Sequence, residues 1–108
     1  MAAFVPVKLP MAGSIVVESR DDVVVLRLVG EVDLETVVAH RRDHQPVPVA
    51  AVDLTEVGFL SSSALSFLIR RTQSVRDSGR LPVLLGVSAQ ARRVLELTGA
   101  LELFAPAP

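Results

Sequence analysis

Three consecutive serines, Ser61, Ser62 and Ser63, are the residues of this sequence best suited to chemistry. They follow a short apolar run at residues 49–54 and stand at the start of a helical pattern. Hydroxyl groups at a helix N-terminus can cap the free backbone N–H groups or accept a phosphoryl group. One serine is enough for the cap, so the surplus favours modification. A phosphoryl group adds about −1.5 to −2 charges, and it would block a partner there without unfolding the domain.

Other residues with catalytic potential have simpler structural explanations. Asp33, Asp53 and Glu56 could act as general acids or bases, but Asp33 has the position of a helix N-cap and Asp53 ends a strand. The serines have no convincing histidine partner, and the sequence contains no P-loop, Gly-x-Gly-x-x-Gly or Gly-x-Ser-x-Gly motif. We therefore expect no enzyme activity, no catalytic residue and no cofactor.

The two histidines are the only hint of a metal site. His40 and His44 are four residues apart, so both could lie on one face of a helix and bind a metal ion. Residues 41–43 between them are charged, and no third ligand is evident, so we expect a solvated helix end and no metal. The sequence has no cysteine, which excludes disulfides and cysteine-bound zinc and fits a reducing cytoplasm.

Size and charge narrow the class of protein further. The chain has 108 residues, enough for one domain with one core. Its net charge is −1 with no basic stripe, so we expect no direct contact with nucleic acid. Charged residues, glycine and proline interrupt every apolar run, so we expect no insertion into a membrane.

Apolar runs predict four strands, at residues 14–18, 23–29, 49–54 and 81–87. The link between the first two is too short for a crossover, so this pair should be antiparallel. The run at 23–29 is almost continuously apolar, which predicts a strand covered on both faces and ended by Gly30. A turn is expected at residues 55–58, between the third strand and the serines.

Capping residues predict three helices. The first starts at Asp33, has Leu34, Val37 and Val38 on one face and fades at residues 41–44. The second runs from the serines to Gly79, and the third runs from Ser88 to Gly99. Leu101, Leu103 and Phe104 should fold back on the core. The predicted core includes Val25, Leu28, Val52, Leu54, Leu68 and Leu84.

The element order β-β-α-β-α-β-α predicts an α/β domain with a mixed, mainly parallel sheet and helices packed on it. Several short motifs occur along this order. They are Gly30-Glu31-Val32-Asp33, Val52-Asp53-Leu54, Phe59-Leu60-Ser61-Ser62-Ser63-Ala64-Leu65, residues 88–94 and Leu97-Thr98-Gly99. Taken together and in this order, these motifs resemble those of the STAS domain, the fold of sulphate-transporter tails and anti-sigma factor antagonists. The likeness implies a STAS domain at 14–104. Two prolines predict an extended arm at 1–13, and the last residues, 105–108, are expected to form a frayed tail.

The resemblance is to the bacterial antagonist type and implies a function in transcription regulation. In that group, an anti-sigma factor that is itself a serine kinase phosphorylates the second serine of an Asp-Ser-Ser-Gly motif. The unphosphorylated antagonist binds the kinase and frees the sigma factor. The matching acceptor is Ser63, with Ser62 as second choice. The implied partner-binding residues are Asp33, Ser61, Ser62, Ser63, Ala64 and Ser66.

Two alternatives stay open. The chain could instead be a STAS subunit that docks on an ABC-type transport ATPase, with the serines serving only as caps. A homodimer is also compatible with the sequence. The chain departs from the family motif at Ser61, which replaces aspartate, and at Ala64, which replaces glycine. Ser61 keeps the capping ability but loses a charge, and Ala64 adds a methyl group where a partner's backbone would approach. Because of both changes, we expect slow phosphorylation even where binding is retained.

Overall fold

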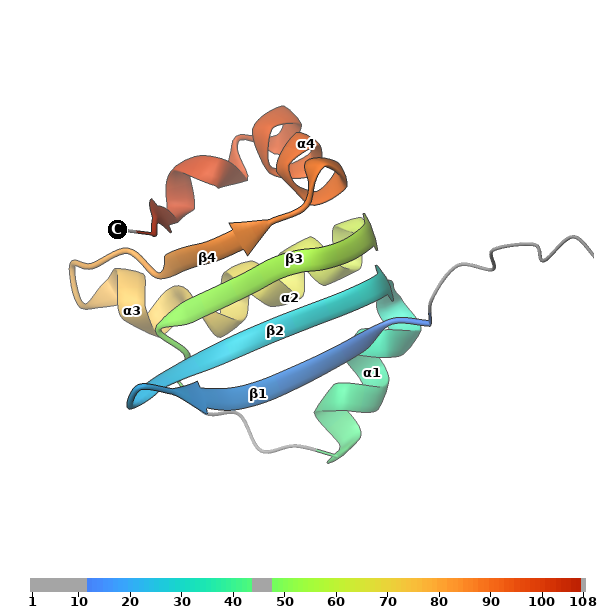
Figure 1. Ribbon diagram of the computed structural model, residues 1–108, viewed down its shortest axis with the longest axis horizontal. Helices are drawn as coiled ribbons and strands as arrows, with labels where there is room; N and C mark the ends of the chain where they lie inside the picture. Colours follow the sequence, from blue (N-terminus) through green and yellow to red (C-terminus); the bar gives the residue numbers. More distant parts are fainter. Residues whose placement is uncertain (1–11, 44–47, 108) are drawn as a thin grey trace, which may run out of the picture.

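The computed structural model describes residues 12–43 and 48–107 and contains one five-stranded sheet (Figure 1). The strands lie side by side in chain order. They are β1 (Ser14–Arg20), β2 (Val23–Val32), β3 (Ala51–Leu60), β4 (Val83–Val87) and β5 (Ala105–Pro106). β1 pairs with β2 antiparallel, as the short link predicts, and all other neighbours are parallel. The expected α/β class with a mainly parallel sheet is confirmed.

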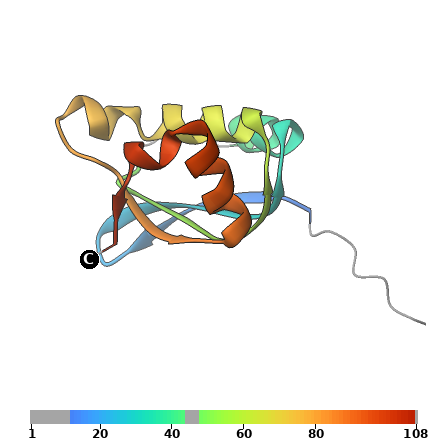
Figure 2. The same cartoon turned by 90° about the horizontal axis from the view of Figure 1, so that it is seen from above.

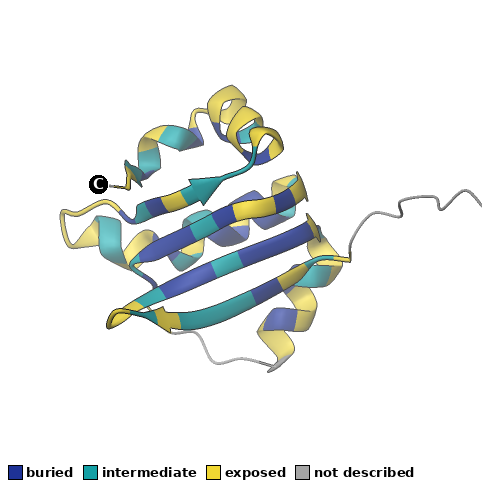
Figure 3. Cartoon of the chain, in the orientation of Figure 1, coloured by how far each residue is buried: buried dark blue, intermediate teal, exposed yellow. Residues whose placement is uncertain are grey.

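The helices cover one face of this sheet. They are α1 (Leu34–Asp43), α2 (Ser62–Arg71), α3 (Gln73–Asp77) and α4 (Ala89–Thr98), followed by a 3₁₀ turn, η1 (Ala100–Leu103). The first three helices form a layer over the sheet, and α4 packs against the same core from the β4 side (Figure 2). All six residues predicted for the core are buried. Figure 3 shows that burial is concentrated along β2 and β3, in the middle of the sheet.

The prediction that the second strand is covered on both faces is confirmed by burial, although no described helix lies over the other face of the sheet. Val25 and Val29 point to that open face, yet they are only 0% and 9% exposed. Glu18 is the register partner of Val25, and long charged side chains stand around it on the same face. Long charged side chains can cover apolar surface with their stems while their charged ends reach water. The open face is thus covered by the sheet's own side chains.

Two strands are longer than the sequence predicts. The expected turn at residues 55–58 is part of β3, and β2 continues past Gly30 to Val32. Register shifts between β2 and β3 occur at Arg27/Val29 and at Gly30/Glu31. Gly30 has a φ of 77°, which suits glycine, so the irregularity bends the strand without ending it.

The predicted second helix is split into α2 and α3 at Thr72. This residue is fully buried, and its Oγ1 donates hydrogen bonds to the carbonyl oxygens of Leu68, at 2.9 Å, and Ile69, at 3.1 Å. Such back-bonding bends or interrupts a helix. Arg76 donates to the Ile69 carbonyl as well, which holds α3 against the end of α2. The observed order therefore has one helix more than predicted at this point.

The last elements follow the sequence signals closely. Ser88 caps α4, since its Oγ accepts a hydrogen bond of 3.1 Å from the Ala91 N–H, and Gly99 ends α4 in the left-handed region at φ 77°. Phe104 is buried, as expected for a segment that folds back.

The two terminal segments expected from the sequence have different outcomes. The expected frayed tail is wrong at residues 105–106, which form β5, and the Ala105 N–H donates to the Pro82 carbonyl at 2.9 Å. Most of the expected N-terminal arm, residues 1–11, lies outside the described residues.

Candidate functional site

The serine run lies where β3 meets α2, and Ser61 is the residue that joins them. Its Oγ accepts a hydrogen bond of 3.0 Å from the Ala64 N–H, so Ser61 is the N-cap of α2. Its own N–H donates to the Val32 carbonyl at 3.0 Å, and its carbonyl accepts from the Leu65 N–H at 2.9 Å. Ser61 therefore ties the helix start to the end of β2, and the capping role expected for one serine belongs to it.

Ser62 and Ser63 occupy the first turn of α2 without a capping role. Ser62 is exposed and Ser63 is half-buried. Within residues 12–43 and 48–107, neither hydroxyl has a hydrogen-bond partner. Both hydroxyls therefore remain available for contact or modification at the positive end of the helix dipole.

Ala64 must be removed from the predicted partner-binding surface. It is 0% exposed and belongs to the hydrophobic core, because the third position of α2 faces the sheet. The methyl group that distinguishes it from glycine therefore packs inward and meets no partner at the surface. Ser66, in contrast, is exposed on the outer side of α2 and remains a surface residue.

Asp33 is the N-cap of α1, as its position predicts. Its Oδ1 accepts hydrogen bonds of 3.0 Å from the Thr36 N–H and from the Thr36 hydroxyl. These bonds, the backbone one first, lower the pKa of Asp33 and keep it ionised. Val32 and Leu60 are register partners at the carboxyl ends of β2 and β3, and each directly precedes a cap. The sheet thus brings the two helix starts, with Asp33 and Ser61, to one edge.

Exposed apolar side chains at this edge were missed by sequence reasoning. Phe59, two residues before Ser61, is 52% exposed, and Leu34, next to Asp33, is 58% exposed. Leu34 and Val38 were expected on the inner face of the first helix with Val37, but only Val37 is buried. Exposed large apolar residues at one edge of a sheet can mark a protein-binding surface. We call the set Asp33, Leu34, Phe59, Ser62 and Ser63 the serine edge.

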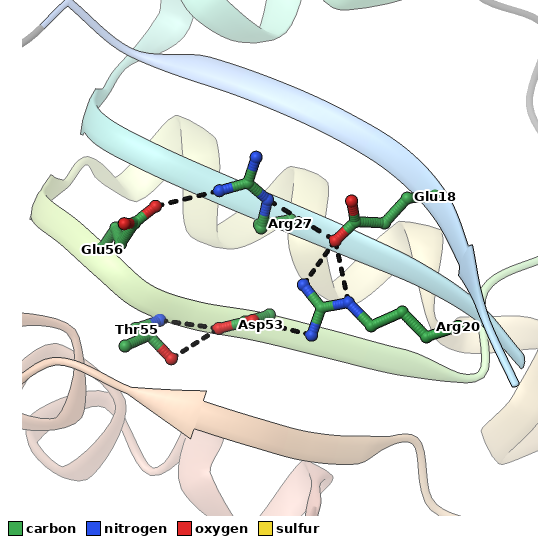
Figure 4. Close-up of a pocket in the computed structure, with 6 residues that line it drawn as sticks. All are labelled: Glu18, Arg20, Arg27, Asp53, Thr55 and Glu56. Carbon is green, nitrogen blue, oxygen red and sulfur yellow. Dashed lines mark hydrogen bonds and ion pairs between the residues drawn. The ribbon is translucent and has the colours of Figure 1, made fainter.

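A second cluster of chemical groups lies on the open face of the sheet (Figure 4). A hollow of 420 Å³ is lined by Glu18, Arg20, Arg27, Asp53, Thr55 and Glu56. Arg20 bonds Glu18 through Nε at 2.9 Å and Asp53 through Nη1 at 3.0 Å. Arg27 contacts Glu56 at 2.9 Å and Glu18 at 3.5 Å. Each acid in the hollow is therefore paired with an arginine.

The acids of this hollow are poorly suited to general base catalysis. Burial raises the pKa of Asp53, but hydrogen bonds from Thr55 and the ion pair with Arg20 outweigh it, so the net pKa is lowered. The Thr55 hydroxyl donates to Asp53 Oδ1 at 2.6 Å and the Thr55 N–H at 3.0 Å. A carboxylate stabilised in this way is a weak base. The ion pairs and the Thr55 hydrogen bonds thus engage every acid that lines the hollow.

The remaining predicted candidates do not converge on a site. His40 is buried, and its ring meets the Phe67 ring edge-on at 5.7 Å, so the expected solvated helix end is wrong at this residue. His44 lies outside the described residues. Across residues 12–43 and 48–107, no three His, Asp or Glu side chains are grouped to hold a metal ion. In the same part of the chain, no helix has the length and apolar character needed to cross a membrane.

Comparison with known proteins identifies a family. The family model of the STAS domain matches residues 14–108, which include every strand and helix described above. No curated protein sequence matches the chain.

Proposed function

Since the chain belongs to the STAS domain family, whose members are in general protein-interaction modules, we propose that it is an anti-sigma factor antagonist. In this proposal it acts in the bacterial cytoplasm and binds an anti-sigma factor that is a serine kinase. Binding sequesters the kinase and releases its sigma factor for transcription. Phosphorylation of Ser63, or of Ser62 as second choice, ends the interaction.

The observation that carries this proposal is the division of roles among the three serines. Ser61 alone caps α2, so the fold does not need the hydroxyls of Ser62 and Ser63. The edge of the sheet at which these two serines lie also carries the exposed residues Phe59 and Leu34. Apolar contact area next to modifiable hydroxyls is what a phosphorylation-controlled interface requires.

The proposed switch follows from charge and volume. The γ-phosphoryl group of ATP moves from ADP to Ser63 Oγ, while the hydroxyl proton passes to a base of the kinase. The first turn of α2 tolerates the new charge because the helix dipole favours anions there. A partner packed over Phe59 and Leu34 would meet added bulk and a desolvated charge. The free domain therefore stays folded while the complex is weakened.

A second candidate function is docking on an ABC-type transport ATPase without phosphorylation. The half-buried position of Ser63 favours it, since a kinase needs fuller access to its acceptor than a docking partner does. In both functions the chain is a binding subunit with no activity of its own. Hydrolysis of ATP or GTP by the purified chain, abolished by a change at Asp33 or Ser63, would overturn the proposal that the chain has no activity of its own.

The test compares parent, Ser63→Ala and Ser63→Glu for binding to the anti-sigma factor kinase of the native cell, by calorimetry. We expect the alanine variant to bind at least as well as the parent and to resist phosphorylation, and the glutamate variant to bind more weakly. Ser74→Glu is the matched control, because Ser74 is exposed on α3 and belongs to no part of the serine edge. Phosphoserine mapping of parent, Ser62→Ala and Ser63→Ala identifies the acceptor. Equal affinity of all variants, with equal thermal stability, would favour the transport-subunit function.

A further inference from the structure

The open face of the sheet carries an apolar groove at the end away from the serine edge. The groove has a volume of 460 Å³ and lies where β3 and β4 begin. Val23, Leu81 and Leu85 are among its lining residues and are exposed to solvent. Val25 and Ala51 form its floor and are buried. Exposed apolar side chains gathered in one groove indicate a surface that is covered in a complex.

The unpaired charges on the two sides of this groove are opposite, because Arg20, which also lines the Asp21 side, is held in ion pairs with Glu18 and Asp53. Asp21 lies in the tight turn between β1 and β2, and Arg80 lies in the segment that leads into β4. Because β3 runs between β2 and β4, these residues stand on opposite sides of the groove. Among the described residues, neither side chain forms an ion pair. The groove is therefore an apolar strip with a free acid along one side and a free base along the other.

We propose that the occupant of this groove is the same groove of a second copy of the chain. A two-fold axis between the two faces and parallel to β3 places Asp21 of each copy opposite Arg80 of the other. The apolar strips meet in the middle. A two-fold interface must be complementary to itself, and opposite charges placed symmetrically about an apolar strip have this property. A partner with charge of one sign would be repelled by one of the two sides.

The available area sets the strength of this contact. Five strands at about 4.8 Å spacing and ten residues at about 3.3 Å rise give the whole open face roughly 790 Å². The part of the open face that holds the groove has roughly half of that area, which is less than the ~800 Å² that each partner buries in a stable interface. The dimer is therefore weak and depends on concentration. It leaves the serine edge accessible, because that edge lies at the other end of the strands.

Charge reversal tests this geometry by sedimentation equilibrium of the purified chain up to roughly 1 mM. Asp21→Arg and Arg80→Asp each place like charges opposite one another at both symmetry-related contacts. Each should raise the dimer dissociation constant by about ten-fold or more. The double variant restores both pairs and should dimerise like the parent. A mixture of the two single variants should form heterodimers, since two arginines of one variant then face two aspartates of the other.

Two controls keep the result independent of folding. Asp21 has a φ of 51°, so Asp21→Asn removes its charge with a residue that tolerates this conformation. Arg70→Asp reverses a charge on the exposed side of α2, behind the sheet, and should leave dimerisation unchanged. Thermal melts check that every variant is folded. A parent that stays monomeric at the highest concentration, or folded single variants that dimerise as well as the parent, would overturn the proposal.

Discussion

Removal of the Ser61 hydroxyl should destabilise the domain, whereas the same change at either neighbouring serine should not. Ser61→Ala deletes the cap of α2 and leaves the Ala64 N–H without its partner at 3.0 Å. Ala64 is 0% exposed, so water reaches this N–H poorly and replaces the lost bond only in part. Ser62 and Ser63 are already inside the helix, and neither can take over the cap position.

The expected size of this effect follows from that geometry. Loss of an N-cap lowers the free energy of unfolding by about 0.5–2 kcal/mol. Because Ala64 is buried, we expect Ser61→Ala to fall in the upper part of this range, at about 1–2 kcal/mol. At about 5 °C per kcal/mol for a domain near 100 residues, the melting temperature falls by roughly 5–10 °C. Ser62→Ala and Ser63→Ala should each change the unfolding free energy by less than about 0.5 kcal/mol.

Urea unfolding followed by circular dichroism measures all three variants against the parent. The variants are well matched, because each deletes one hydroxyl from adjacent positions. A Ser61→Ala variant as stable as the parent would refute the capping assignment. So would a loss at Ser63→Ala equal to that at Ser61→Ala, because it would mean that the proposed acceptor hydroxyl also holds the fold.

Three further predictions concern the core, the first helix and the sheet. Leu68 is fully buried, so Leu68→Ala should cost about 2–5 kcal/mol in a denaturant melt; a loss well under about 1 kcal/mol would count against its place in the core. The pKa of Asp33 is lowered in the folded state, so its contribution to stability is present above the ordinary aspartate pKa and disappears as the pH falls through the lowered value. Asp33→Asn keeps a capping side chain but removes the charge, so the stability of this variant should not show the same loss at acidic pH. If parent and variant lost stability identically as the pH falls, the proposed role of ionised Asp33 would be contradicted. A Cβ at Gly86 would collide with the Thr55 hydroxyl, so Gly86→Ala should destabilise by about 1–3 kcal/mol, and by clearly less in a Thr55→Ala background.

The sequence predicts most of the fold because its signals are local. Apolar runs locate four strands, and Asp33, Ser88 and Gly99 mark helix ends through their own backbone or side-chain hydrogen bonds. The short link at Asp21 also decides that the first two strands are antiparallel. These features depend on neighbours in the chain, so periodicity and capping rules detect them.

The missed features depend on contacts between distant residues. The break at Thr72 needs the buried hydroxyl and the Arg76 bond to Ile69, neither of which periodicity reveals. The burial of Val25 under charged side chains needs the register between β1 and β2. At the candidate site, the sequence predicts that Asp33 and the serines stand at helix starts, as the structure has them, but it assigns Ala64 to the surface. Only the packing of α2 on the sheet decides which way that methyl group points.

The strand that ends the sheet also affects how the protein behaves at high concentration. β5 has two residues, and one of them, Pro106, has no N–H group to donate. β4 has only its first two residues paired with β5, and α4 and η1 follow it closely in the chain. An edge this short and poor in donors offers little template for an extended strand of another molecule. At high protein concentration, β5 therefore gives the sheet little tendency to form β-aggregates from this side.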